Sequence, residues 1–290
     1  MNSMKISIIG SGFVGTAIGR GLIELGNEVI FYDIVDKDLP NFTKDINYAI
    51  KGPDVSFICV PTPTRENGEI DQSYIKEAMK SIGKALANKD AYHLIVVKST
   101  VVPGTTENIV IPILEKFSGK SVRDCEIGVC MNPEFLTEIT NTWTNDEDYK
   151  KDFFTEDRII IGEYDKKSGE TLEELYKPLG KHIFRVDLKT AEMIKYTSNC
   201  MLATKISYWN EIFLICKVLG IDSKIIANIV ALDPRIGKYG TIHGKAFGGK
   251  CLPKDLKAFI SFVKKYREPK LMKAVNNINE DMKKKYGVRE

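Results

Sequence analysis

The segment at residues 248–255 reads Gly-Gly-Lys-Cys-Leu-Pro-Lys-Asp, a composition suited to a reactive cysteine. Two glycines permit a tight turn, and Pro253 suits the first turn of a helix, where its missing N–H costs no hydrogen bond. Cys251 would then precede a helix N-terminus beside Lys250 and Lys254, and these positive charges favour the thiolate, the form that attacks. The segment therefore predicts a nucleophile, although a small buried cysteine beside a turn fits the same pattern.

A second group of residues has the spacing of a phosphate-binding turn. Residues 5–9 read as a strand that leads into Gly10-Ser11-Gly12-Phe13-Val14-Gly15, and a helical pattern follows to about Leu25. The N–H groups at the start of that helix would bind a pyrophosphate. The next strand, 28–33, ends on Asp33, which would accept hydrogen bonds from both ribose hydroxyls and repel a 2′-phosphate. These features predict NAD rather than NADP, unless the glycines only shape a turn.

Three polar segments follow other strand-like runs, at the ends where a doubly wound sheet binds its ligands. They are Pro61-Thr62-Pro63-Thr64, Lys98-Ser99-Thr100 and Asn132-Pro133-Glu134-Phe135-Leu136-Thr137-Glu138. Taken singly, each also fits a structural role as a stiff loop, a helix cap or a solvated pair of glutamates. Their shared position makes them candidates for ligand binding.

A sheet must position these residues, because strand-like and helical runs alternate along the first part of the chain. Strands are expected at 5–9, 28–33, 55–60, 94–97, 126–130 and 158–161, with helices at 16–25, 74–86 and 107–117. This alternation predicts an α/β fold with a doubly wound, mostly parallel, Rossmann-like sheet.

The rest of the chain has helical periodicity. Helices are expected at 188–219, 222–231, 253–266 and 269–286. Lys195 and Asn199 are four residues apart and therefore share one face of the first of these helices, a spacing that a solvated lysine also shows. With a boundary near Val186, we expect an NAD-binding domain at 1–186 and an all-helical domain at 187–290.

Composition narrows the possible functions. With 43% hydrophobic and 28% charged residues and a net charge of +3, the chain is expected to fold, and charge gives no case for nucleic acid binding. No run reaches the roughly 18 apolar residues of a membrane span, and a strand by Ile6 leaves no room for a signal sequence. The 6 cysteines lack paired metal spacing, so we expect no metal site and a cytoplasmic location.

Taken together, these segments resemble the UDP-glucose/GDP-mannose dehydrogenase family, in family order and over nearly the whole chain. The matching segments are GSGFVG (10–15), CVPTPT (59–64), VVKSTVVPGTT (96–106), NPEFLTE (132–138), DRIIIG (157–162), AEMIKYTSN (191–199), DPRIG (233–237) and GGKCLPKD (248–255). The resemblance implies an NAD-dependent, four-electron oxidation of a UDP-sugar, UDP-glucose to UDP-glucuronate. GDP-mannose, a UDP-N-acetylhexosamine and a non-catalytic NAD-binding subunit that needs a partner chain remain alternatives.

The resemblance also implies roles for single residues. Cys251 would capture an aldehyde as a thiohemiacetal and then form a thioester. Lys195 and Asn199 would stabilise an oxyanion. Asp255 and Thr100 would position a catalytic water, and Glu134 would act as a general acid and base. Cofactor contacts would come from Gly10, Gly12, Phe13, Val14, Gly15, Asp33, Thr62, Thr100, Glu138 and Lys254. Substrate contacts would come from Glu134, Phe135, Leu136, Lys195, Asn199, Arg235 and Gly248.

The chain departs from the family pattern in several places. Family members normally continue into a second doubly wound domain that binds the nucleotide, and this chain ends at Glu290. The segment between Asp33 and Cys59 is shorter than usual, and the loop at 139–157 is longer and acidic. The loop at 244–249 has fewer glycine and aromatic residues. The resemblance further implies a homodimer that pairs through the long helices.

Overall fold

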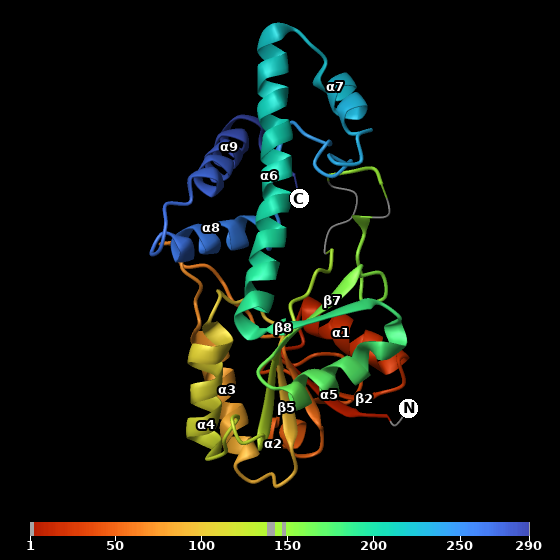
Figure 1. Ribbon diagram of the computed structural model, residues 1–290, viewed down its shortest axis with the longest axis vertical. Coiled ribbons are helices and arrows are strands. Elements are labelled where there is room, and N and C mark those ends of the chain that lie inside the picture. Colours follow the sequence, from red (N-terminus) through yellow and green to blue (C-terminus); the bar gives the residue numbers. More distant parts are fainter. Residues whose placement is uncertain (1–2, 138–142, 147–148, 290) are drawn as a thin grey trace. The chain divides into compact units, whose positions relative to one another are not determined.

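The computed structural model describes residues 3–137, 143–146 and 149–289 (Figure 1). The chain forms two compact units. The first consists of Met1–Pro63, Asp71–Leu136 and Lys151–Lys195, and the second of Thr64–Ile70, Thr137–Lys150 and Tyr196–Glu290. The long helix α6, Leu188–Leu219, begins in the first unit and continues into the second.

A sheet of eight described strands forms the centre of the first unit, in the order β3-β2-β1-β4-β5-β6-β7-β8 (Figure 1). The strands are β1 Lys5–Ile9, β2 Glu28–Tyr32, β3 Phe42–Thr43, β4 Val55–Ile58, β5 His93–Val97, β6 Ile127–Met131, β7 Arg158–Glu163 and β8 His182–Asp187. All neighbours pair in parallel except β6 and β7, which are antiparallel. The predicted doubly wound, mostly parallel sheet is confirmed.

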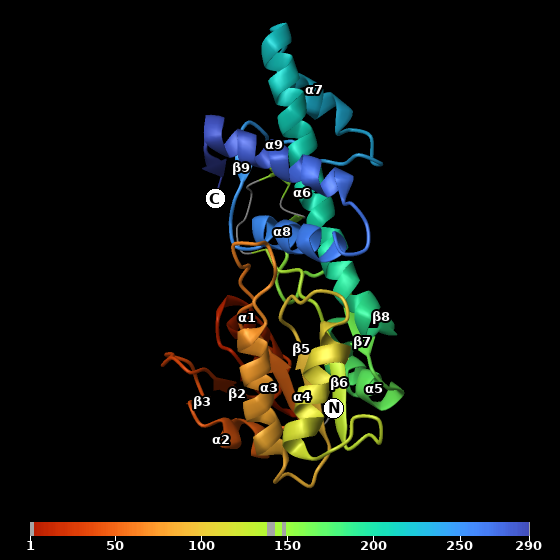
Figure 2. The same ribbon diagram turned by 90° about the vertical axis from the view of Figure 1, so that its left-hand side faces the viewer.

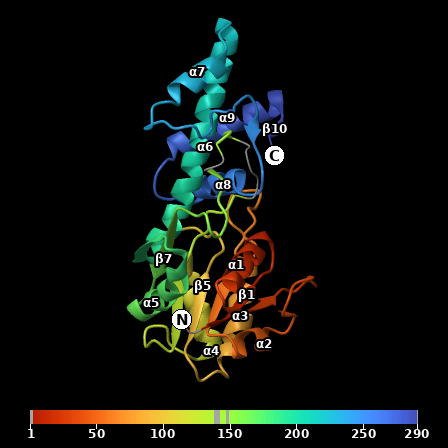
Figure 3. The same cartoon turned by 90° about the vertical axis from the view of Figure 1, so that its right-hand side faces the viewer.

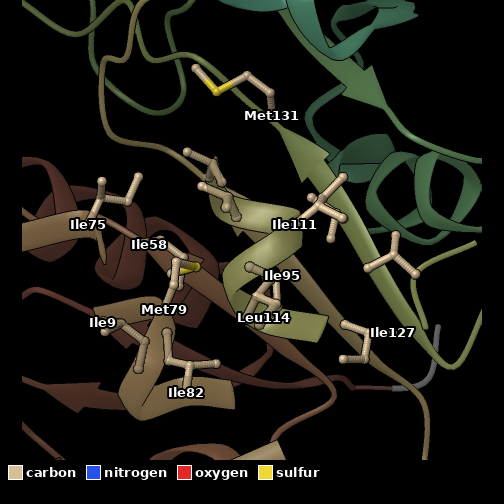
Figure 4. Packing of buried hydrophobic residues seen from close by; sticks show 14 of the residues in the cluster. Ile9, Ile58, Ile75, Met79, Ile82, Ile95, Ile111, Leu114, Ile127 and Met131 are labelled. Atoms are coloured by element: carbon tan, nitrogen blue, oxygen red, sulfur yellow. The ribbon is translucent and has the colours of Figure 1, made fainter. Parts of the chain in front are cut away.

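Helices cover both faces of this sheet. They are α1 Phe13–Glu24, α2 Ile46–Lys51, α3 Ser73–Leu86, α4 Ile111–Ser118 and α5 Lys166–Tyr176, with short turns η1 Thr106–Val110 and η3 Lys177–Leu179. Figure 2 shows α3 and α4 side by side. On their face of the sheet, Ile9, Ile58 and Ile95 pack with Met79 and Leu114 (Figure 4). The opposite face packs on α1 and α5 through Ile8, Phe57, Val96, Ile18, Leu22 and Leu172. Burial on both faces explains why these strands are mostly apolar in the sequence.

The second unit contains the rest of α6 and three further helices, α7 Ser223–Val230, α8 Leu252–Val263 and α9 Lys270–Tyr286. All were expected from the helical periodicity. A short parallel pair, β9 Ala246–Phe247 and β10 Val288–Arg289, was not expected, because two residues carry no periodic signal. Figure 3 shows β10 directly after α9, at the carboxyl-terminal end.

No helix within 3–137, 143–146 and 149–289 is both long and apolar enough to cross a membrane. Over the same residues, there is no group of three or more His, Cys, Asp or Glu side chains that could hold a metal ion.

A chain of buried polar side chains crosses three strands of the sheet. Ser7 Oγ on β1 lies 2.6 Å from Ser56 Oγ on β4, which lies 2.8 Å from His93 Nε2 on β5. Lys89 Nζ lies 2.8 Å from His93 Nδ1 and donates to the carbonyl oxygen of Pro53. Burial, with the positive charge of Lys89 adding to it, lowers the pKa of His93 to about 3. The imidazole is therefore neutral in the folded protein.

This neutral histidine predicts a distinct acid sensitivity. Because its pKa is lower in the folded than in the unfolded state, stability is retained above about pH 6.5 and is lost as pH falls toward about 3. For each unit by which the pH falls in this window, we expect the unfolding equilibrium constant of the wild type to rise by up to about tenfold more than that of His93→Asn. Urea unfolding at several pH values measures this difference. The exposed His182→Asn should keep the wild-type pH dependence, and equal profiles for His93→Asn and wild type would contradict the expectation.

Candidate functional site

The glycine turn after β1 has the geometry of a phosphate cradle. Gly10 has a φ of +97°, and a Cβ on it would lie 2.7 Å from the carbonyl oxygen of Cys59. A Cβ on Gly15 would lie 2.1 Å from the carbonyl oxygen of Gly10, so only glycine fits either position. Gly12 is the N-cap of α1, and a Cβ there would meet no described atom within 4 Å. Open space thus lies before the positive end of a helix, where a phosphate is stabilised.

Asp33 follows β2 and is fixed against this turn. Its Oδ2 accepts a hydrogen bond from the Ser11 N–H at 2.9 Å, and its Oδ1 accepts one from the Val35 N–H at 3.1 Å. The carboxylate therefore lies beside the glycine cradle, the position expected of a residue that accepts hydrogen bonds from ribose hydroxyls. The cradle and this carboxylate fit NAD. Their neighbours Phe13, which is exposed, and Val14, which is half-buried, belong to the first turn of α1.

The polar segments after β4 and β5 come together as predicted. Thr62 is buried after β4, and Thr100 is half-buried after β5. Ser99 joins the two segments, since its Oγ donates to the carbonyl oxygen of Val60 at 2.7 Å and to that of Ile58 at 3.2 Å. Both threonines therefore lie at the carboxyl ends of neighbouring strands, and their contacts with a cofactor or a water stay predictions.

Glu134 and Lys195 form a buried ion pair in the first unit. Lys195 Nζ lies 3.2 Å from Glu134 Oε1 and 2.5 Å from the carbonyl oxygen of Glu134, and their side chains are 4% and 8% exposed. The Leu136 N–H donates to Glu134 Oε2 at 2.8 Å. Burial alone would raise the pKa of Glu134, but Lys195, the Leu136 N–H and Lys98 hold it below its usual value. The solvated lysine considered from its spacing is therefore wrong for Lys195.

The aromatic residue of the same loop lies close to two cations. The Phe135 ring centroid is 4.5 Å from the Arg158 guanidinium carbon and 5.3 Å from Lys195 Nζ. Phe135 and Leu136 are half-buried. Attraction between a cation and an aromatic face helps to fix this loop.

Cys251 is the N-cap residue of α8 in the second unit, with Pro253 in the first turn of that helix. The predicted position ahead of a helix N-terminus is confirmed. Cys251 is exposed, so the alternative of a small buried cysteine is wrong. A thiol here experiences the positive end of the helix dipole, which favours the thiolate.

Asp255 lies one helical turn after Cys251 and is only 1% exposed. Its Oδ2 accepts a hydrogen bond from Asn199 Nδ2 at 2.6 Å, and its Oδ1 accepts one from Lys254 Nζ at 2.5 Å. The Asp255 N–H donates to the Cys251 carbonyl oxygen at 2.9 Å. The second unit therefore brings together the predicted nucleophile and three other predicted residues. Lys254 is paired with Asp255 here, and its predicted cofactor contact stays a prediction.

Two predicted substrate residues, Arg235 and Gly248, have other surroundings. Arg235 is exposed, and its NH2 group lies 2.6 Å from Asp233 Oδ2. A Cβ on Gly248 would lie 2.3 Å from Val288 Cγ1, so packing against β10 already requires glycine there. Glu138 lies outside the described residues.

Three buried charged residues of the first unit were missed as site residues. Lys98 was noticed only as part of a polar segment, and Glu156 gave no sequence signal because its partners are distant in sequence. Glu192 lies on α6 one turn before Lys195, a spacing that could have revealed it. Its carboxylate accepts hydrogen bonds from the Gly104 N–H and, at 2.8 Å, from the Thr106 N–H, and burial raises its pKa to about 6.

Comparison with known proteins identifies related sequences over most of the chain. The family model described as "UDP-glucose/GDP-mannose dehydrogenase family, NAD binding domain" matches residues 35–180, and the central domain of the same family matches residues 189–281. A GDP-mannose 6-dehydrogenase of Pseudomonas syringae is 39% identical over 284 residues, which cover 88% of this chain and 63% of the relative. A UDP-glucose 6-dehydrogenase of Haloferax volcanii is 37% identical, with 96% of this chain and 70% of the relative covered.

A solved structure gives a similar result. A UDP-glucose dehydrogenase from Pyrobaculum islandicum superposes with a TM-score of 0.89 at 32% identity, and the match covers 98% of this chain and 69% of that one. The chain thus spans 63% to 70% of the length of these relatives.

Proposed function

Because the chain belongs to the UDP-glucose/GDP-mannose dehydrogenase family, we propose that it is an NAD-dependent sugar-nucleotide 6-dehydrogenase that converts UDP-glucose to UDP-glucuronate. The observation that carries this proposal is the exposed Cys251 at the N-terminus of α8, one turn before the buried Asp255. Oxidising an alcohol only to an aldehyde needs no nucleophile, whereas carrying the oxidation to a carboxylate does.

Residues of the first unit would contribute to the first oxidation. When bound, NAD would accept one hydride in each of two successive oxidations. The C6 hydroxyl of the sugar would pass its proton to Glu134, and the buried ammonium of Lys195 would stabilise the developing alkoxide. Loss of hydride from C6 then leaves an aldehyde.

Cys251 would act in the second oxidation. Its thiolate would add to the aldehyde carbon, and the new C–S bond gives a thiohemiacetal whose oxyanion Lys195 and Asn199 would stabilise. Loss of the second hydride leaves a thioester. A water oriented by Asp255 and Thr100 would attack the thioester carbon, so that the C–S bond breaks, the carboxylate leaves, the thiolate is restored and the two protons of the water pass to solvent.

A panel of sugar nucleotides tests this function. We expect NADH formation, followed by absorbance, with a higher kcat/KM for UDP-glucose than for GDP-mannose or a UDP-N-acetylhexosamine. GDP-mannose is the second candidate, because one relative of this chain is named for that substrate. NADH from none of these sugar nucleotides would contradict the proposal, and NADH only after a second polypeptide is added would favour a non-catalytic subunit.

We further propose that the protein forms a homodimer through its long helices. Within the second unit, exposed apolar side chains gather on α6, α7 and the turn after α7; they are Met201, Tyr208, Ile215, Val218, Leu219, Ile225, Ile229 and Leu232. An exposed apolar surface of this extent is typical of a protein interface. The pattern supports pairing of α6 and α7 with a second copy.

Light scattering on the purified protein tests this dimer. We expect a dimer for the wild type and a monomer for the double variant Val218→Glu/Ile229→Glu, since buried unpaired carboxylates oppose association. Leu271 is equally apolar and exposed, but it lies on α9 outside this surface, so Leu271→Glu should remain dimeric. A monomeric wild type would overturn the proposal.

The cysteines support a cytoplasmic location, which we also propose. Cys130, Cys200 and Cys216 are buried within the two units, and Cys251 has to stay reduced to act as a thiolate. A reducing compartment preserves such thiols.

A further inference from the structure

Lys98 is buried in the first unit, and its ammonium bonds to an amide oxygen with carboxylates of the described residues nearby. It is 3% exposed, and its Nζ donates to Asn132 Oδ1 at 2.8 Å. The same oxygen accepts a hydrogen bond from Tyr176 Oη at 2.7 Å, and Asn132 Nδ2 donates to the carbonyl oxygen of Ile160 at 2.7 Å. Burying an ammonium is costly unless nearby negative charges and hydrogen-bond acceptors stabilise it. Lys98 therefore fixes Asn132, the residue that opens the loop at 132–136.

Glu156 holds the same loop at its other end. Its Oε1 accepts a hydrogen bond from the Phe135 N–H at 3.0 Å, and it is 9% exposed. Between these two attachments stands Glu134, paired with Lys195. Two cations and two carboxylates thus occupy one buried cluster, formed by Lys98, Lys195, Glu134 and Glu156, whose formal charges cancel.

We propose that Lys98 and Glu156 are positioning residues that together fix the loop at 132–136, and that Lys98, by offsetting the charge of Glu156, keeps Glu134 ionised until it accepts a proton. This inference rests on the proposed role of Glu134 as acid and base. Lys98 supplies the positive charge that offsets Glu156, which leaves Lys195 to balance Glu134. If Lys98 were lost, two buried carboxylates would share one ammonium, and the cluster would hold a proton.

The shifts of the ionisable groups agree with this arrangement. Burial lowers the pKa of Lys98, which Glu156 and Glu134 counteract, and burial raises the pKa of Glu156, which Lys98 counteracts. Cys59, which also lies close to Glu134, is a neutral thiol because burial raises its pKa to about 12. Tyr176 is neutral as well, since burial raises its pKa well above 10. Among the described residues, the charged side chains close to Glu134 include Lys195, Lys98 and Glu156, and Arg158 lies against the Phe135 ring.

Titration of Glu134 tests the proposal without any need for enzymatic activity. In protein labelled with ¹³C at glutamate carboxyl carbons, the NMR signal absent from Glu134→Gln reports the ionisation of Glu134. We expect Lys98→Met to raise its titration midpoint by about one to three pH units, because a nearby opposite charge is lost. The double variant Lys98→Met/Glu156→Gln restores neutrality, so its midpoint should return close to that of the wild type.

Two further variants separate charge from structure. Tyr176→Phe removes a hydrogen bond to Asn132 but no charge, so it should leave the Glu134 midpoint in place. Glu156→Gln alone should lower the Glu134 midpoint, opposite to the rise expected for Lys98→Met. This downward shift can be measured even if Lys98→Met fails to fold. An unchanged midpoint in Lys98→Met, or no return in the double variant, would overturn the proposal.

Activity provides a separate readout. The acid limb of the kcat profile for NADH formation should move with the NMR midpoint in each variant. A protein that shows the NMR shifts but forms no NADH would contradict the proposed function and leave the role of Lys98 supported. A protein that forms NADH with an acid limb independent of these variants would contradict the role of Lys98.

Discussion

Replacing Cys251 with serine is expected to abolish complete oxidation of the sugar nucleotide, with kcat lower by at least about 10³-fold. The positive end of the α8 dipole favours the thiolate of Cys251, whereas a serine hydroxyl in the same place is a weaker nucleophile and cannot form a thioester. NADH progress curves with saturating NAD and UDP-glucose measure the loss.

A matched cysteine shows whether the effect belongs to this position. Cys125 is half-buried and precedes the amino-terminal end of β6, whereas the polar segments of the first unit follow the carboxyl ends of its strands, so Cys125→Ser should keep kcat close to the wild-type value. A kcat for Cys251→Ser within about tenfold of the wild type would rule out a covalent role for this sulfur.

Replacing Lys195 with methionine is expected to reduce both activity and stability. Loss of the ammonium removes the charge that would stabilise the oxyanion, which costs about 10²–10³-fold in kcat. It also leaves the carboxylate of Glu134, 8% exposed, without its partner, and breaking a buried pair in this way costs about 3–5 kcal/mol of unfolding free energy. NADH formation and urea unfolding measure the two effects.

A double variant separates these two consequences. Lys195→Met/Glu134→Gln removes both charges, so stability should recover substantially while activity stays low. If Lys195→Met alone unfolded at the wild-type urea concentration, the ion pair would contribute nothing to the fold. If it kept the wild-type kcat, Lys195 would have no role in the chemistry.

The sheet was predictable from the sequence because its central strands are buried on both faces. The run 94–97 is continuously apolar and 55–60 is interrupted only by Ser56, so both are visible. The edge strand β8 alternates exposed and half-buried residues, and β3 has only two residues, so neither gave a signal. The antiparallel pairing of β6 with β7 depends on the path of the intervening loop, which no local pattern records.

The candidate site was predictable in its residues but not in their pairing. Helical spacing placed Lys195 and Asn199 on one face, and turn chemistry placed Cys251 before a helix. That Asn199 binds Asp255, and that Glu134 binds Lys195, depends on contacts between residues far apart in the sequence. The neutral buried cluster around Lys98 is missed for the same reason, because periodicity reports faces and not partners.

The stoichiometry of NADH formation tests most directly whether one chain carries an alcohol through an enzyme-bound thioester to a carboxylate. With UDP-glucose limiting and NAD in excess, we predict two NADH for each sugar nucleotide consumed and UDP-glucuronate as the product. One NADH for each sugar nucleotide, with an aldehyde released, would contradict the role of Cys251 and with it the four-electron oxidation.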